Sequence, residues 1–283
     1  MVYLKNSQIS ITIKELGAEV IEGKFKNGKD FIWTGVEGWS DHAPILFPIC
    51  GRVLDNKYSY EGKVYDMPFH GFAHCFNFEV LEKSDETALL SLKYNEETLK
   101  MYPFKFEFRI RYTLIENKVE VTYETINLDK REILFSAGGH EGFLCDKGVE
   151  NYYVEFDNPV TLNSCKLNGS FLNGNTEKVV ENGKRVNLRC DGYRSYDLIF
   201  KDIDFTAVTL YSPEGKKMVR AEFEGFPNLL IWSIPDGKFV CIEPWCGLPD
   251  FIGDKGCFEE KRGLIKVPAG ESYTLIHSYT VFE

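Results

Sequence analysis

Residues 104–112, FKFEFRIRY, alternate apolar with charged residues at almost every position. Successive side chains of a β-strand point to opposite faces of a sheet, so this period of two predicts a long strand with one buried face. Residues 119–126 follow a turn at 116–118 and also alternate, which predicts an antiparallel partner strand. The apolar face of such a pair needs a second layer of structure to cover it.

Strand patterns separated by short turns continue along the whole chain. The only helix candidate is segment 95–102, which Pro103 ends. We find no linker, no low-complexity stretch and no repeat of solenoid or propeller period. We therefore expect one domain over residues 1–283, an all-β, large antiparallel β-sandwich with few short helices. Besides the pair above, the expected strands lie at 8–14, 20–25, 30–33, 58–65 (a hairpin), 76–81, 88–94, 133–135, 205–211, 217–223, 229–232, 239–242 and 273–279.

Composition narrows the possible partners. A chain of 283 residues that is 43% hydrophobic can bury a large core. The net charge of −10 argues against nucleic acid and anionic membrane surfaces, since both attract basic patches. It is compatible with a neutral small ligand. The oligomeric state is left open.

The cysteines and the N-terminus indicate a cytoplasmic protein. The first residues lack a basic region followed by an apolar run, and no apolar segment is long enough to span a bilayer. Eight scattered cysteines without a signal peptide indicate reduced thiols. The spacing of Cys241 and Cys246 is roughly that of two cysteines that bind one zinc ion, but no second pair of cysteine or histidine ligands accompanies them. We therefore expect no metal and no cofactor.

Segment 136–143, SAGGHEGF, is the most distinctive candidate for a site. It places an imidazole, His140, and a carboxylate beside three glycines. Glycine allows a close approach of the backbone, and histidine can exchange a proton near neutral pH. The alternative is a glycine-rich turn at a strand end in which His140 has no chemical role.

Four other positions combine polar groups with apolar surroundings. Arg52 follows the apolar run 45–50, and His70 lies in the loop sequence FHGFA. Glu243 stands at the end of an apolar strand before Pro and Trp, where a carboxylate is costly unless it is paired or faces a pocket. The alternatives are that Arg52 is a surface charge, that His70 is an exposed turn histidine and that Glu243 is an ordinary strand-end glutamate. Trp232 could belong to the core or to a surface on which a sugar stacks.

These motifs together resemble the aldose 1-epimerase (galactose mutarotase) family, in particular its bacterial mutarotase-like branch. The ordered series is FPICGR, HGFA, GGH and EPWCGLPD, and it extends over nearly the whole chain. The resemblance implies a large antiparallel β-sandwich and a cytoplasmic isomerase that interconverts the anomers of a free aldohexose. It implies that Arg52 and His70 bind the sugar, that His140 is the general acid and that Glu243 is the general base.

One member of the family pattern has no obvious match. Better-known galactose mutarotases carry an aspartate that holds sugar hydroxyls, and Asp197 is the nearest candidate, with a turn residue as the alternative. For acid and base catalysis, Glu243 should be ionised and His140 protonated, each contributing about 10²–10⁴-fold. Two other functions remain open. The sandwich could be a non-catalytic sugar sensor, or it could act on sugar phosphates with help from Arg52 and from Lys63 or Arg220.

Overall fold

The predicted pair of long strands lies within the largest sheet of the computed structural model, which describes residues 1–36, 38–188 and 196–283. β8 (Phe106–Ile115) and β9 (Lys118–Asn127) pair antiparallel without a register shift. Every second side chain of β9 is buried, as the alternation predicts. The sheet has nine strands. Next to β9 lie, in order outward, β20 (Ser272–Val281), β16 (Lys217–Glu222), β15 (Ala207–Tyr211), β12 (Tyr153–Asn168) and β13 (Phe171–Asn187). Next to β8 lie β7 (Thr87–Lys93) and then β6 (Glu79–Lys83).

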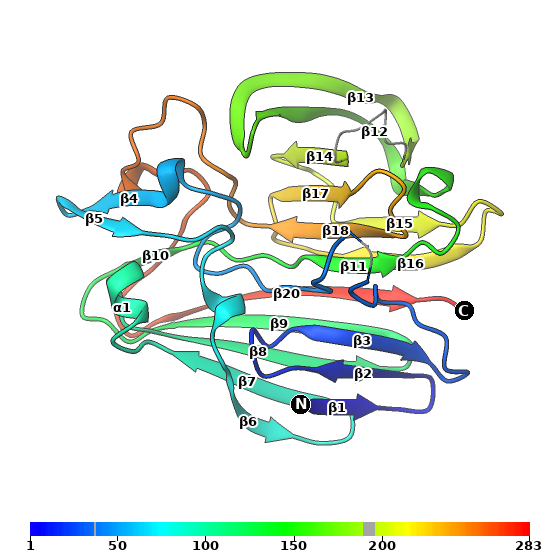
Figure 1. The fold of residues 1–283 in the computed structure, drawn as a ribbon, viewed down its shortest axis with the longest axis horizontal. Helices are drawn as coiled ribbons and strands as arrows, with labels where there is room; N and C mark the ends of the chain where they lie inside the picture. Colours follow the sequence, from blue (N-terminus) through cyan, green and yellow to red (C-terminus); the bar gives the residue numbers. More distant parts are fainter. Residues whose placement is uncertain (37, 189–195) are drawn as a thin grey trace.

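Two smaller sheets form the opposing layer (Figure 1). One contains β1 (Val2–Lys5), β2 (Ile9–Ile13) and β3 (Val20–Phe25). The other has the order β11 (Glu141–Leu144), β18 (Phe239–Trp245), β17 (Asn228–Ser233) and β14 (Tyr196–Lys201). An antiparallel bridge between Ile32 and Phe143 joins them edge to edge.

Aromatic side chains fill the space between the two layers. Phe47 stacks on Phe108 of the large sheet with ring centroids 4.2 Å apart. Tyr112 donates its hydroxyl hydrogen bond to the carbonyl of Ala18 at 2.7 Å. Phe143 of β11 meets Tyr279 of β20 at 5.4 Å. The layers are thus packed against each other along their length, as a sandwich requires.

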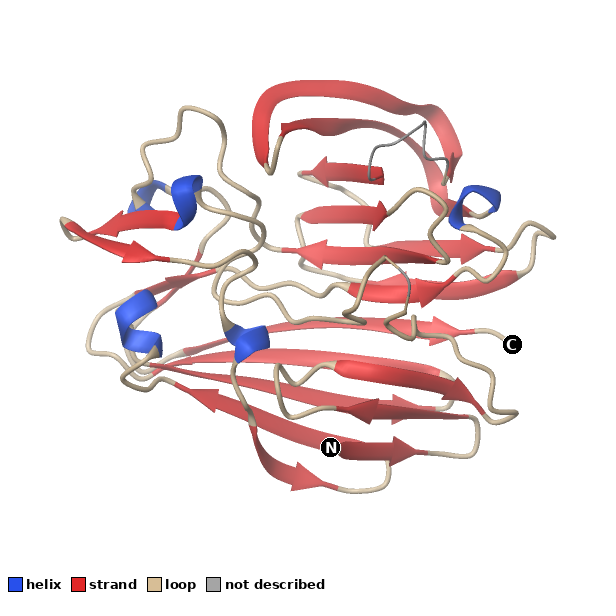
Figure 2. Ribbon diagram, in the orientation of Figure 1, coloured by secondary structure: helices blue, strands red, loops and turns tan. Residues whose placement is uncertain are grey.

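Short elements complete the fold, which contains little helix (Figure 2). β4 (Lys57–Tyr60) and β5 (Lys63–Asp66) form a hairpin, and β10 (Ile133–Phe135) pairs with β19 (Ile265–Val267). The one α-helix in the described ranges is α1 (Thr98–Met101), inside the predicted segment. The 3₁₀ turns are Leu54–Asn56, Ala73–Cys75, Val149–Asn151 and Phe258–Glu260.

The predicted fold class is confirmed, and several elements differ in detail. Residues 30–33 form only isolated bridges, with Asp30 opposite Lys24 of β3 and Ile32 opposite Phe143 of β11, so they connect the two small sheets. Asp197 lies in β14, so its interpretation as a turn residue was wrong. The long hairpin β12–β13 was missed, because its register shifts repeatedly and most of β13 is exposed, which removes a regular alternation.

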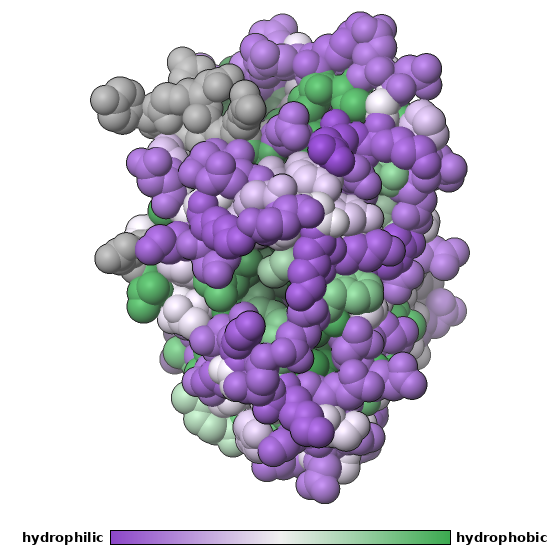
Figure 3. Space-filling view, turned by 90° about the vertical axis from the view of Figure 1, so that its right-hand side faces the viewer, coloured by the Kyte–Doolittle hydropathy of each residue, from purple (hydrophilic) through white to green (hydrophobic). Residues whose placement is uncertain are grey.

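The remaining general expectations concern thiols and membranes. The seven cysteines among the described residues are unpaired; Cys190 lies outside them. No helix in the described chain is long and apolar enough to cross a bilayer. On the side of the molecule shown in Figure 3, hydrophilic residues cover most of the surface, and apolar side chains show mainly in recessed patches.

Candidate active site

One face of the four-stranded sheet forms part of the wall of a cavity of about 600 Å³. Asp197 and Ile199 of β14, Leu230 and Trp232 of β17, and Glu243 and Trp245 of β18 all line it. Each pair is two residues apart in its strand, so all six side chains point to the same face. The other lining residues are Gly51, His140 and Pro249 and residues of segments 39–44, 68–74 (which contains His70) and 167–170.

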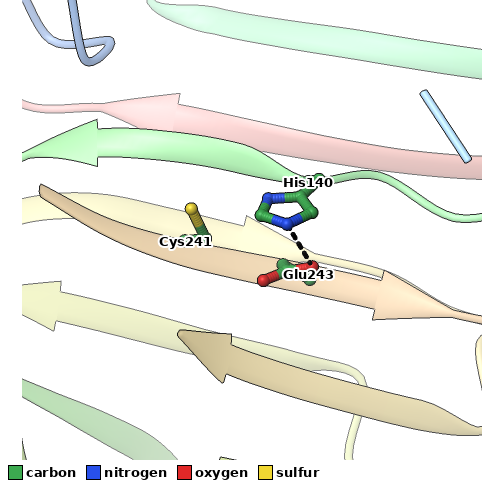
Figure 4. A group of neighbouring side chains, drawn as sticks. All are labelled: His140, Cys241 and Glu243. Atoms are coloured by element: carbon green, nitrogen blue, oxygen red, sulfur yellow. Dashed lines mark ion pairs between the residues drawn. The ribbon is translucent and has the colours of Figure 1, made fainter. Parts of the chain in front are cut away.

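Strand register brings His140 and Glu243 together. β11 pairs with β18 so that Glu141 lies opposite Ile242. The position before Glu141 is therefore opposite Glu243, and residues directly opposite each other in antiparallel strands have adjacent side chains. Figure 4 shows His140, at the start of β11, and Glu243, on β18, with their side chains directed toward each other.

Glycines in segment 136–143 let its backbone pack against β18. A Cβ atom on Gly138 would lie 2.7 Å from Cδ1 of Trp245 and 2.8 Å from the carbonyl oxygen of Pro244. The backbone N–H of Gly139 donates to that carbonyl at 3.2 Å. These glycines thus allow a close approach of the backbone to strand β18.

His140 and Glu243 form a buried pair. Nε2 of His140 lies 3.3 Å from Oε2 of Glu243, and the two residues are 8% and 1% exposed. The contact lacks the geometry of a regular hydrogen bond, and Oε2 has no hydrogen-bond partner in the part of the chain that the structure describes. A carboxyl group so buried would be costly in a purely structural role, which favours a functional one.

Burial decides the protonation of this pair. It lowers the pKa of His140 to about 4, although the Glu141 and Glu19 carboxylates act in the opposite direction. Burial also raises the pKa of Glu243 well above its usual range, and the charges of Glu141 and Asp197 add to this effect. The Trp245 indole N–H slightly favours the carboxylate without being placed for a regular hydrogen bond. The expected ionised Glu243 and protonated His140 are thus disfavoured in the empty pocket.

His70 is held as a neutral hydrogen-bond donor at the wall of the cavity. Its Nδ1 accepts a hydrogen bond from the backbone N–H of Gly51 at 3.2 Å. Burial, followed by the charge of His140, lowers the pKa of His70 well below its usual value. A neutral imidazole that accepts at Nδ1 carries its proton on Nε2, so that nitrogen can donate to a ligand. His70 has φ +63°, and at Gly71 a Cβ would lie 2.1 Å from the carbonyl oxygen of Phe47, so the loop requires glycine there.

Arg52 lies beside the cavity and is not among its lining residues. Its guanidinium lies over the ring of Phe69, 4.8 Å from the centroid, and its buried Nε has no hydrogen-bond partner. Its carbonyl accepts a hydrogen bond from Asp250 N–H at 2.9 Å, and Asp250 is held by buried Lys261 at 2.6 Å. Asp250, part of the distinctive sequence pattern, thus anchors the backbone of Arg52.

Aromatic rings surround His140. Trp39 stacks on its imidazole with centroids 5.1 Å apart, and Trp232 meets it edge-on at 5.6 Å. The Trp33 indole donates to the carbonyl of Trp39 at 2.8 Å and fixes this wall. Trp232 is half-buried and lines the cavity, so its role as a stacking surface stays possible. Apolar ring faces beside polar groups suit a sugar, which has apolar C–H faces and a polar rim.

Sequence reasoning missed several lining residues. Trp39, Asp41 and His74 line the cavity. Trp39 and Asp41 lie in WSDHAP, just before the FPICGR motif, and His74 lies just after HGFA. Their closeness to two motifs was the available signal. No periodicity marks them, because they lie in irregular backbone or a 3₁₀ turn.

The atoms most suited to a metal belong to the same pair. His140, Cys241 and Glu243 each offer a ligand atom, and these atoms lie within 4.8 Å of one another. Burial, followed by the charges of Glu243 and Glu141, raises the pKa of the Cys241 thiol well above its usual value. Metal ligands must lose their protons, and the raised pKa values of Cys241 and Glu243 oppose that loss.

Glu19 holds the loop that carries Trp39 and Asp41. Its carboxylate accepts hydrogen bonds from the backbone N–H groups of His42 and Ala43, at 2.7 and 2.9 Å, and contacts Lys14 at 2.5 Å. Burial opposes its ionisation, but hydrogen bonds from His42, Lys14 and the backbone outweigh that effect and lower its pKa to about 2.

The fold and cavity define an antiparallel β-sandwich protein with a histidine–glutamate pair in an aromatic-walled pocket. A profile of the aldose 1-epimerase family matches residues 1–280. The chain therefore belongs to the aldose 1-epimerase family.

Relatives and solved structures agree with this assignment. Chromosomal protein LacX of Lactococcus lactis is 31% identical over 93% of both chains. A galactose mutarotase related enzyme from Lactobacillus acidophilus superposes with a TM-score of 0.93 at 32% identity, over 99% of this chain and 97% of that one. A galactose mutarotase-like protein from Lactobacillus casei has a TM-score of 0.91 at 29% identity, over 100% of both chains.

The Glu19 contacts predict a specific dependence of stability on pH. Because the folded-state pKa of about 2 lies below the ordinary 4.5, ionised Glu19 stabilises the fold above about pH 4.5, and this contribution is lost as the pH falls toward 2. Glu19→Gln should lower the free energy of unfolding at neutral pH by about 3 kcal/mol and flatten its fall in acid. Urea unfolding between pH 7 and 3 measures both effects. Glu82→Gln, an exposed glutamate, is the control; equal pH curves for Glu19→Gln and the parent would contradict the prediction.

Proposed function

We propose that this protein is an aldose 1-epimerase that interconverts the α and β anomers of a free aldohexose. The observation that carries the proposal is the His140–Glu243 pair at 3.3 Å, buried at one wall of the cavity, in which Nδ1 of His140 and Oε2 of Glu243 have no hydrogen-bond partner among the described residues. Membership of the aldose 1-epimerase family supports the same reaction.

The chemistry requires two proton transfers at neighbouring oxygens. A base takes the proton of the hydroxyl on C1 while an acid protonates the ring oxygen. The C1–O5 bond then opens, the aldehyde turns about C1–C2, and the ring closes on its other face. Both oxygens are attached to C1, so an acid and a base only 3.3 Å apart can serve them together.

The pair holds one proton in either of two forms. Neutral His140 with protonated Glu243 and the ion pair differ only in where that proton lies. Burial favours the neutral form of both groups in the empty pocket. Sugar hydroxyls that enter the cavity supply hydrogen bonds that favour the ionic form, in which Glu243 acts as base and His140 as acid.

Other lining residues would position the sugar. His70 can donate from Nε2, Asp197 can accept from hydroxyl groups, and Trp232 can stack on the ring. Arg52 lies beside the cavity with its guanidinium over the ring of Phe69, a lining residue, and would donate to a sugar oxygen from that side.

The two alternatives receive less support. A sensor needs only hydrogen bonds, whereas this cavity also buries an acid–base pair. A phosphate ester would require cations, and the described residues that line the cavity include Asp41, Asp197 and Glu243 but no lysine or arginine. Lys63 belongs to the β4–β5 hairpin, and Arg220 pairs with Asp157, so neither lines the cavity.

The deciding experiment follows the mutarotation of freshly dissolved α-anomers of glucose and galactose by polarimetry or NMR, with sugar phosphates in parallel. We expect the parent protein to accelerate anomer exchange, with or without a chelator. Glu243→Gln and His140→Asn should each lose about 10²-fold or more in turnover while folding and sugar binding persist. The two losses should not add, since both groups serve one step.

Clear outcomes would overturn the proposal. A parent protein that binds sugars without changing their mutarotation rate is a sensor. A Glu243→Gln protein that keeps most of its activity would remove Glu243 from the mechanism. Activity lost to a chelator and restored by zinc would contradict the metal-free reaction.

The pH profile of turnover should be bell-shaped with an unusually acidic lower limb. The working pair holds one proton, and a second proton binds to His140 only near pH 4, so turnover should fall below about pH 4. At high pH the last proton is lost and turnover falls again. Initial rates from pH 3.5 to 9 measure both limbs; a lower limb near pH 6.5, the usual pKa of histidine, would contradict the burial argument.

Arg52 and His70 should act in positioning the sugar. Arg52→Ala and His70→Asn should weaken binding and also slow turnover, because a misplaced ring loses its alignment with the acid and the base. Binding is measured by calorimetry and turnover by polarimetry. If both variants bind and turn over sugar like the parent, neither residue serves the site.

A further inference from the structure

A second histidine–glutamate pair lies directly behind the first. Glu141 follows His140 in the sequence, and its side chain points to the opposite face of β11. Its Oε1 lies 2.7 Å from Nε2 of His277 on β20, and the side chains are 5% and 3% exposed. This contact crosses from the four-stranded sheet to the nine-stranded sheet and ties the two layers together.

The Glu141 carboxyl group also packs beneath the backbone that carries His140. A Cβ atom on Gly139 would lie 2.5 Å from Oε2 of Glu141 and 2.9 Å from Oε1. Gly139 has no positive φ, so its backbone conformation does not demand glycine. The glycine at this position is instead explained by the carboxyl group that fills the space of its side chain.

The groups that face the second pair are neutral at ordinary pH. The ring centroid of Tyr123 of β9 lies 5.2 Å from that of His277, and the hydroxyls of Tyr123 and Tyr279 have no hydrogen-bond partner among the residues described. Burial, followed by the charge of Glu141, raises the pKa of both phenols well above the usual value. Tyr112 of β8 has a pKa raised by burial, then by Tyr279, Glu141 and Glu19.

His277 is thus the one basic side chain that contacts Glu141 in the described parts of the chain. Removing one partner of a buried pair leaves the other uncompensated, which is costly, so each residue fixes the other. Because the two residues are adjacent in the chain, the position of Glu141 fixes the direction in which the side chain of His140 points toward the cavity.

We propose that Glu141 and His277 are positioning residues that fix the orientation of the His140 imidazole from behind the sheet. The expected changes in kcat and KM rest on the proposed function, whereas the expected change in the orientation of the His140 side chain does not. Neither residue touches the cavity, so the pair acts only through the backbone of segment 139–141 and through its charge.

The charge effect has a definite sign. The Glu141 carboxylate raises the pKa of His140, and it also raises that of Glu243. Its loss should therefore lower both values and move the pH profile of turnover toward acid. The other titratable groups around His140, namely Glu243, Glu19 and His70, stay in place in every variant described below.

The test uses two variants that disturb the pair in different ways. Glu141→Gln keeps the shape of the side chain and removes its charge. Gly139→Ala keeps both members and places a methyl group where the carboxyl group lies. Glu107→Gln is the matched control, because Glu107 is 4% exposed, belongs to the large sheet, and interacts with Ser91 and Arg109 away from the cavity.

Two readouts are measured on each folded protein. The first is the set of imidazole NMR signals of the five histidines, assigned with the His140→Asn variant. The second is kcat and KM for mutarotation across pH. We expect Glu141→Gln and Gly139→Ala to shift the His140 signals and to lower kcat about 10-fold with little change in KM, since small misplacements of a catalytic group are costly. Glu107→Gln should lower stability without either change.

A double variant separates positioning from general damage. His277→Gln should resemble Glu141→Gln, and the two together should lose little more than either alone, because they act as one unit. Unchanged His140 signals and unchanged kcat in Glu141→Gln and Gly139→Ala would overturn the inference. A parent protein without mutarotase activity would overturn the proposed function instead, while the His140 signals would still decide this inference.

Discussion

The antiparallel register between β11 and β18 is the constraint on which the rest of the site depends. It places Glu141 opposite Ile242 and thereby His140 beside Glu243. Because side chains alternate along a strand, consecutive residues 140 and 141 serve opposite faces of the sheet, one in the cavity and one in the core. A slip of one residue would exchange the two faces, burying the first imidazole in the core and removing the contact with His277.

Glycine fixes this register through close packing. Gly138 brings the segment against Pro244 and Trp245, and Gly139 makes room for the Glu141 carboxyl group. A side chain at either position would push the segment away from β18 or displace the carboxyl group from His277. The glycine pair of the sequence motif therefore has two separate physical reasons, and only the first could be anticipated from the sequence.

The sequence predicted the fold well because alternation survives wherever one face of a strand is buried and the other is not. β8 and β9 show this clearly, and β12–β13 shows the limit, since register shifts and exposure remove the pattern. Of the site, His70, His140, Glu243, Asp197 and Trp232 all line the cavity, whereas Arg52 lies beside it. Trp39, Asp41 and His74 were missed, because no periodicity marks them and long-range contacts such as those of Glu19 place their irregular segments; their closeness to two motifs was the one signal.

The cost of burial reveals how the cavity is prepared for a ligand. Four buried atoms have no hydrogen-bond partner within residues 1–36, 38–188 and 196–283, and their residues all line the cavity: Nδ1 of His74, Nδ1 of His140, Oε2 of Glu243 and Nε1 of Trp245. Each unsatisfied buried group costs about 1–3 kcal/mol. A ligand rich in hydroxyl groups can recover part of this free energy on binding, since hydroxyls both donate and accept. The second pair, Glu141 with His277 at 2.7 Å, shows the contrast, because there the carboxylate has its partner and needs no ligand. The sheet thus separates a hydrogen-bonded pair that links the two layers from a pair at the cavity whose contact lacks the geometry of a regular hydrogen bond.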